Sequence, residues 1–203
     1  MHTEPSTAVQ IPTYAQAHAL FEEAETGVTV SRTDFKSRAN ALRAELLEAQ
    51  TTLRESDFPV VAMFAGVDGA GKGELTNLLS EWMDPRGITT RAFGSPTDEE
   101  AERPPYWRFW RDLPPRGNIG LFLSAWYSDP LLDRVHRRVD EDAFDDRLDE
   151  IGSFERTLAA DGALILKFWM HLGKQAQRKR LKSLEKDPLQ HWRVTKRDWD
   201  HWK

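Results

Sequence analysis

The 203-residue chain contains no cysteine, which excludes disulfide bonds and thiolate metal sites and fits a reducing cytoplasm. It also lacks any apolar run near the roughly 20 residues that a membrane-spanning helix needs. Its first residues, Met-His-Thr-Glu-Pro-Ser, have neither the basic start nor the apolar core of a secretory signal. Charged residues make up 30% of the chain, and its mean hydropathy is -0.62. We therefore expect a cytoplasmic protein with no membrane partner.

A glycine-rich stretch lies between an apolar run and an amphipathic segment. Residues 60–65 are continuously apolar and predict a buried strand. Leu75, Leu78 and Leu79 recur at helical spacing and predict a helix. Between these segments, Gly-Val-Asp-Gly-Ala-Gly-Lys-Gly over residues 66–73 fits the phosphate-binding loop up to its last position.

This stretch predicts a phosphate site, because glycines bring backbone N–H groups onto phosphate oxygens and the lysine adds a positive charge. A turn that merely caps the helix is the less favoured alternative. Gly73 replaces the usual Ser or Thr, so the hydroxyl ligand for magnesium is missing and Asp68 is the nearest oxygen that could replace it. The predicted loop residues are Gly66, Asp68, Gly69, Ala70, Gly71, Lys72 and Gly73.

The remaining pattern predicts an α/β fold. Apolar residues at helical spacing predict a helix over residues 33–56, and strand-like runs occupy residues 88–93, 118–125 and 163–169. Strands that alternate with helices indicate a parallel sheet with helices on both faces, with buried strands at 60–65, 118–125 and 163–169. We expect residues 1–30 to form a partly ordered arm and residues 31–203 to form one domain.

Residues 94–117 differ from ordinary core sequence, because arginines and aromatic residues alternate there across a short predicted helix bounded by prolines. A solvated loop with surface arginines is one interpretation. A lid or channel wall that neutralises phosphate oxygens is the other, and we favour it because Asp112 is the only acid close to the arginines in sequence. These arginines are Arg103, Arg108, Arg111 and Arg116.

Charge is unevenly distributed along the chain, whose formal net charge is -5. Residues 140–150 contain seven acids, which indicate a solvated helix face, with metal binding as a remote alternative. Residues 167–203 contain 11 Lys/Arg against 4 Asp/Glu. A basic segment that follows a sheet strand suits an extended anionic ligand.

Three segments together resemble the family-2 polyphosphate kinases: residues 66–73, residues 107–117 running into Trp126-Tyr127, and residues 167–192. The resemblance covers residues 58–203 in the family's order. It is strongest to polyphosphate:AMP phosphotransferases, which carry two fused copies of the domain, and this chain resembles their N-terminal copy, truncated at its C-terminal end. The resemblance implies a P-loop kinase-like fold with an Arg/Trp-rich lid.

The family transfers phosphoryl groups between inorganic polyphosphate and a nucleotide, such as AMP to ADP, with Mg²⁺. By resemblance, Asp68 positions metal and acceptor, and Lys72 holds the phosphates undergoing transfer. The lid and channel residues implied in this way are Arg103, Trp107, Arg108, Arg111, Lys174 and Arg180. The expected partners are polyphosphate, a nucleoside mono- or diphosphate, a fused second copy and further subunits of a homo-oligomer, but no nucleic acid.

The chain departs from the family where active members read Asp-Arg-Ser-Trp-Tyr. Here Leu123 replaces the carboxylate that ligates magnesium and Ser124 replaces its arginine neighbour. Asp129 follows six positions later, past the strand end, and could replace the carboxylate only if the loop bent back. We favour its interpretation as a helix-capping residue before Pro130. We expect a catalytically weakened copy; a non-catalytic polyphosphate-binding or structural domain is the alternative, and an ATP-dependent small-molecule kinase is a weaker third.

Overall fold

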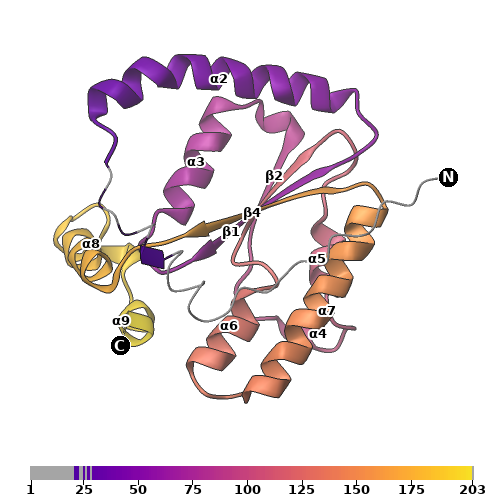
Figure 1. Cartoon of the computed structure of the whole chain (residues 1–203), viewed down its shortest axis with the longest axis vertical. Coiled ribbons are helices and arrows are strands. Elements are labelled where there is room, and N and C mark those ends of the chain that lie inside the picture. Colours follow the sequence, from indigo (N-terminus) through magenta and orange to yellow (C-terminus); the bar gives the residue numbers. More distant parts are fainter. Residues whose placement is uncertain (1–20, 23–24, 26, 28, 203) are drawn as a thin grey trace.

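The structure of the protein, a computed structural model, describes residues 21, 22, 25, 27 and 29–202 (Figure 1). Most of the predicted N-terminal arm, including residues 1–20, lies outside the described residues. Among the described residues, no helix combines the length and the apolar character that a membrane crossing requires.

The centre of the fold is a four-stranded sheet in the order β2-β3-β1-β4. Every neighbouring pair is parallel, and Val60 of β1 lies opposite Ile119 of β3 and Leu164 of β4. The strands span Val60–Gly66 (β1), Ile88–Ala92 (β2), Ile119–Leu123 (β3) and Leu164–Met170 (β4). The predicted parallel sheet and the positions of all four strands are confirmed.

One helix, α3 (Lys72–Trp82), covers one face of the sheet, and α2 (Arg32–Arg54) packs against α3 (Figure 1). Ser31 begins α2 because its hydroxyl accepts a hydrogen bond from the backbone N–H of Asp34. On this face Leu75 and Leu79 of α3 pack against a buried cluster of Ala62, Phe64 and Leu121. A short 3₁₀ turn, Pro85–Gly87, then returns the chain to β2.

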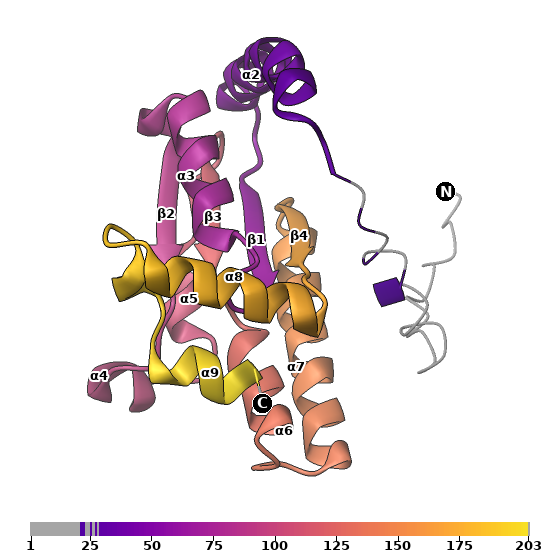
Figure 2. The same ribbon diagram turned by 90° about the vertical axis from the view of Figure 1, so that its left-hand side faces the viewer.

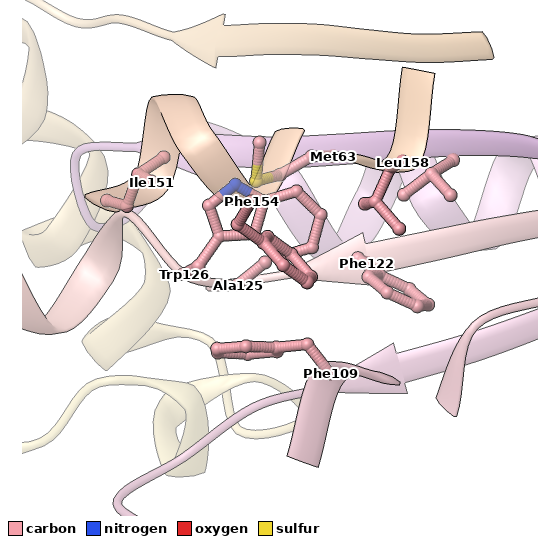
Figure 3. Packing of buried hydrophobic residues seen from close by; sticks show 9 residues of the cluster. Met63, Phe109, Phe122, Ala125, Trp126, Ile151, Phe154 and Leu158 are labelled. Atoms are coloured by element: carbon pink, nitrogen blue, oxygen red, sulfur yellow. The ribbon is translucent and has the colours of Figure 1, made fainter. Parts of the chain in front are cut away.

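The other face carries α4 (Asp98–Ala101), α5 (Trp107–Asp112), α6 (Ser128–Val135) and α7 (Glu141–Ala160) (Figure 1). Its core is aromatic, and the rings of Phe109, Phe122 and Phe154 surround Trp126 (Figure 3). Trp126 meets each of these three rings edge-on at centroid distances between 5.1 and 6.3 Å. Such pairs stabilise a core by about 0.5–1.5 kcal/mol each beyond the burial of their area. Helices on both faces are therefore confirmed.

The chain after β4 passes beside the carboxyl ends of the strands. It forms α8 (Lys174–Lys186), a 3₁₀ turn at His191–Arg193 and α9 (Lys196–Trp202), with α8 lying across the strand ends (Figure 2). Gln177, Leu181 and Leu184 are the buried residues of α8. Two indoles attach α9 to α8, because Trp199 donates to Glu185 at 2.7 Å and Trp202 donates to the carbonyl of Lys174 at 3.0 Å.

The prediction that residues 163–169 form a buried strand is wrong. β4 is an edge strand of this sheet, and Leu164, Leu166 and Phe168 are 45%, 39% and 44% exposed. These side chains lie on the same side of the sheet as α3. However, α3 packs mainly over β1 and β3 and leaves β4 largely uncovered. An apolar run therefore identified the strand correctly but not its place in the sheet.

Candidate phosphate-binding site

The loop between β1 and α3 needs glycine at specific positions. Gly66 has a φ of 127°, and a Cβ built on it would lie 2.0 Å from the carbonyl oxygen of Met170. The backbone of β4 therefore closes onto the start of the loop, where the N–H of Val67 donates to the same carbonyl at 3.1 Å. Gly71 begins α3 with a φ of 96°, which favours glycine. The loop thus ends at a helix N-terminus, where backbone N–H groups and the helix dipole favour phosphate.

Lys72 lies folded along this loop. Its Nζ donates to the carbonyl oxygens of Gly66 at 2.7 Å and Val67 at 2.9 Å. Burial lowers the pKa of Lys72, and the negative charges of Asp68 and Asp198 oppose that shift. The ammonium is therefore held at the mouth of the loop by carbonyl oxygens, a position from which it can move to an incoming phosphate oxygen.

Asp68 connects the loop with both C-terminal helices. Its carboxylate meets Nδ1 of His201 at 2.7 Å, and its backbone carbonyl accepts a hydrogen bond from the Gln177 side chain at 3.0 Å. Gln177 is buried, so α8 fixes the backbone of the loop. His201, from α9, fixes the carboxylate.

Glu74, in the first turn of α3, pairs with two arginines. Arg193 approaches its Oε1 to 2.9 Å and Arg180 to 3.0 Å. Burial raises the pKa of Glu74, but the hydrogen bond from Arg193 and the charges of both arginines outweigh burial and hold it below its usual value. Two cations from the C-terminal segment are thereby placed beside the phosphate loop.

A cavity of about 620 Å³ opens in front of the loop, at the carboxyl edge of the sheet. This edge is where parallel α/β sheets bind their ligands. Asp68, Lys72 and the turn after β2 form one part of its wall, and Leu131, Val135 and Trp169 supply apolar surface. The charged side chains of the wall are Asp68, Lys72, Asp129, Arg193, Arg197 and Asp198, with His201 beside them.

The end of β3 faces this cavity without a carboxylate on the strand itself. Ser124 lines the cavity with a φ of 52°, and its N–H donates to the carbonyl of Phe64 at 3.2 Å. Leu123 is half-buried and is not among the described residues that form the wall. The Trp126-Tyr127 pair has a structural role here, because Trp126 donates to Glu155 at 3.0 Å and Lys167 bridges Glu155 and the Tyr127 hydroxyl.

The interpretation of Asp129 as a capping residue is wrong. The N-cap of α6 is Tyr127, which makes no side-chain capping bond, and Asp129 stands inside the first helical turn. Its exposed side chain lines the same cavity as Asp68 and Lys72. Because α6 begins at Ser128, Asp129 reaches the site, and the cavity contains a carboxylate close in sequence to the end of β3, in addition to Asp68 and Asp198.

The predicted lid arginines are all engaged with acids or aromatic rings. Arg108 is largely buried, donates to the carbonyl of Gly94 at 3.0 Å and lies 3.6 Å from Glu100. Arg111 pairs with Glu100 at 3.1 Å and stands 5.0 Å from the ring centroid of Trp107. Arg103 pairs with Glu99 at 3.4 Å. Asp112 is therefore not their only acid, because α4 supplies two more.

The predicted site residues consequently form two groups. Gly66, Asp68 and Lys72 line the cavity, and Arg180 joins them through Glu74. Gly69, Gly71 and Gly73 line a smaller recess of about 120 Å³, whose wall also includes Asp68 and Lys72. Lys174 stands at the start of α8, 5.0 Å from the ring centroid of Trp202. Among the described residues, the cavity wall includes neither the lid set Arg103, Trp107, Arg108 and Arg111 nor Lys174.

Sequence reasoning missed several residues of the wall. Arg193, Asp198 and His201 come from the turn before α9 and from α9 itself. The excess of basic residues after β4 indicated an anion site in this region, but no local pattern distinguished these side chains from other charged residues there.

The parallel sheet, the glycine-rich loop after its first strand and the lysine at the start of α3 define a P-loop protein of the kinase type. The chain belongs to the polyphosphate kinase 2 family, whose model matches residues 29–203. The resemblance found in the sequence is confirmed.

Individual members of this family show how similar the chain is to known polyphosphate phosphotransferases. A polyphosphate:AMP phosphotransferase of Pseudomonas aeruginosa is 47% identical over 181 residues, which are 89% of this chain and 36% of that protein. The corresponding protein of Pseudomonas syringae is 44% identical over the same share of each chain. A crystal structure of polyphosphate kinase 2 from Arthrobacter aurescens is 31% identical with a TM-score of 0.78, covering 87% of this chain and 66% of that one. This chain thus spans about a third of the length of the two phosphotransferases.

Proposed function

We propose that this domain binds inorganic polyphosphate and a nucleoside phosphate, and that the protein containing it transfers phosphoryl groups between polyphosphate and AMP. The observation that carries the proposal is Lys72 at the mouth of a glycine loop, facing a cavity at the carboxyl edge of the sheet. The 47% identical relative is a polyphosphate:AMP phosphotransferase, which supports the choice of substrates. The apolar part of the wall suits a nucleoside, and the loop suits its phosphates.

We further propose that this copy transfers phosphoryl groups only slowly. Phosphoryl transfer depends on positioning and on neutralising the charge of the phosphates. Leu123 cannot ligate a metal. The cavity wall contains three carboxylates and three Lys or Arg side chains, namely Asp68, Asp129, Asp198, Lys72, Arg193 and Arg197. The wall therefore carries as many carboxylates as Lys and Arg side chains, whereas a polyanion would be bound best by an excess of cations.

Magnesium fits the donor set of this site. Asp68 and Asp129 offer carboxylate oxygens to one cavity, and Mg²⁺ prefers oxygen ligands and retains several waters. When bound, the ion would neutralise phosphate charge. Asp68 would hold it, and His201 would orient Asp68 through their 2.7 Å contact. Lys72 would bind the phosphate oxygens.

The lid residues enter this proposal as the outer wall of the polyphosphate path. Arg103 and Arg111 keep half-exposed guanidinium groups over Trp107, where they can meet further phosphates of a long chain. Lys174 and Arg180 would continue the path along α8. Arg108 would act indirectly, because its contacts with Glu100 and the Gly94 carbonyl hold the lid to the turn that lines the cavity.

A second candidate function is a non-catalytic domain that holds polyphosphate or supports an active second copy. Two features favour this second function: the cavity wall has no excess of cations, and an apolar residue, Leu123, stands where a metal-ligating carboxylate is expected. The share of each phosphotransferase that this chain spans is compatible with such a second copy in a longer protein.

The test separates binding from transfer. Titration calorimetry with tripolyphosphate and with ADP, with and without Mg²⁺, measures binding; conversion of AMP to ADP with polyphosphate measures transfer. We expect binding of both ligands and only trace conversion. Binding without any conversion favours the non-catalytic polyphosphate-binding domain. No binding of either ligand contradicts the proposed function and favours a domain that only supports an active second copy.

A further inference from the structure

A second recess lies between α5 and α7, lined by residues that are not shared with the phosphate cavity. It is a groove of about 650 Å³ with an aromatic floor. Tyr106 stacks on the buried ring of Phe154 at 4.8 Å, and Trp110 meets that ring edge-on at 5.1 Å. Trp110 nevertheless remains 45% exposed. An exposed indole beside a half-buried tyrosine is a typical surface for the stem and the charge of a lysine or arginine.

Acids from the outward side of α7 border this groove. Asp142, Asp146 and Asp149 are exposed and lie at a spacing of four and three residues, so they form one stripe along the helix. Glu150 joins them at the edge of the groove. None of the ion pairs found within the described part of the chain involves these four acids. Within the described residues, these four acids therefore have no ion-pair partner.

The outward side of α8 carries the opposite charge at a matching spacing. Lys179, Lys182 and Lys186 are exposed, and ion pairs among the described residues involve none of them. At about 100° per residue they point away from the buried face of α8. That buried face consists of Gln177, Leu181 and Leu184. The three lysines are therefore a free basic stripe.

The two stripes match when their helices run antiparallel. Along α7, the aspartates are separated by four residues (Asp142 to Asp146) and then by three (Asp146 to Asp149). Along α8 in the reverse direction, the lysines are separated by the same four and three residues. Both sets of charges then recur at rises of about 6 and 4.5 Å along their helices. Within one copy α7 lies along one face of the sheet and α8 lies across the strand ends, so a chain does not pair its own stripes (Figure 1).

We propose that a second copy of this chain docks its α8 antiparallel along α7. Lys186, Lys182 and Lys179 of one copy then face Asp142, Asp146 and Asp149 of the other, and the stem of Lys179 lies on Trp110 in the groove. The contact is head-to-tail, because each copy offers α7 to one neighbour and α8 to another. It uses none of the residues assigned to the phosphate cavity and is independent of the proposed function.

Sedimentation velocity at low and at high salt tests this contact. The wild-type chain is expected to self-associate at low salt and to dissociate as salt screens the charges. Asp146→Lys with Asp149→Lys makes both stripes basic, and Lys179→Asp with Lys182→Asp makes both acidic. Each double variant alone is expected to lose self-association by at least about tenfold.

Mixing the two double variants gives the decisive result. In the mixture, the basic stripes of one variant face the acidic stripes of the other. The equimolar mixture is therefore expected to associate, although neither variant does so alone. Glu45→Lys with Glu48→Lys on the exposed side of α2 is the matched control, because it changes net charge equally and should self-associate like the wild type. A wild-type chain that stays monomeric at low salt, or a mixture that stays monomeric, overturns the proposal.

Discussion

Replacing Lys72 by methionine tests the phosphate loop most simply. The change keeps the length of the side chain and removes its charge. Lys72 donates to the carbonyls of Gly66 and Val67 at 2.7 and 2.9 Å, so the fold loses two hydrogen bonds. Burial already disfavours the charged lysine, as its lowered pKa indicates. An apolar replacement removes this desolvation cost. The free energy of unfolding should therefore change by no more than about 1 kcal/mol.

Ligand binding should respond far more strongly. A hydrogen bond to a charged group contributes about 1.5–3 kcal/mol, which corresponds to a loss of about 10- to 100-fold in affinity for a phosphate ligand. The contrast between a small effect on folding and a large effect on binding distinguishes a phosphate contact from a structural lysine.

Titration calorimetry of tripolyphosphate into wild-type and Lys72→Met protein measures the change, and urea unfolding measures stability. Lys36→Met, on the exposed side of α2, is the control for a lost charge and should bind like the wild type. An affinity of Lys72→Met within twofold of the wild type would refute the assignment of the loop as the phosphate site.

Three further predictions concern the scaffold. Gly66→Ala should destabilise the fold by at least about 3 kcal/mol in urea unfolding, because its Cβ would meet the Met170 carbonyl at 2.0 Å; an unchanged midpoint would contradict the close approach of β4. Arg108→Gln should lower the midpoint of thermal unfolding by several degrees and weaken polyphosphate binding only through the lid, because its guanidinium contacts Glu100 and not the cavity; a large loss of binding without a loss of stability would make it a direct ligand. Hydrogen bonds from two arginines hold the pKa of Asp84 well below its usual range, so its contribution to stability is complete above about pH 4 and is lost as the pH falls further. Asp84→Asn should therefore destabilise the protein at pH 7 more than at pH 3, and an equal effect at both would contradict the ion pairs.

The sequence was sufficient where the signal is local. The apolar run at residues 60–65 and the glycines that follow encode a strand and a loop that only glycine can form, so β1, the loop and α3 were predictable. The exposure of β4 was not, because whether Leu166 is covered depends on where α3 packs and not on β4 itself. An edge strand and a central strand can share one apolar pattern.

The composition of the site depended on contacts between distant residues. Asp129 enters the cavity because α6 begins at Ser128, and a shift of a helix start by one or two residues lies below what a pattern resolves. His201 reaches Asp68 across 133 positions. Glu100 neutralises Arg111 from 11 positions away, so counting neighbours in sequence overestimated the free charge of the lid.

One assay tests directly whether this domain holds phosphates but transfers them poorly. Conversion of AMP to ADP with polyphosphate and Mg²⁺ is measured for this chain alone and, in parallel, for the polyphosphate:AMP phosphotransferase of Pseudomonas aeruginosa. Since the loss of one charge-stabilising contact commonly costs about 10²- to 10³-fold in rate, the chain should be at least about 100-fold slower. A turnover within tenfold of that relative would contradict the claim and make the domain an enzyme in its own right.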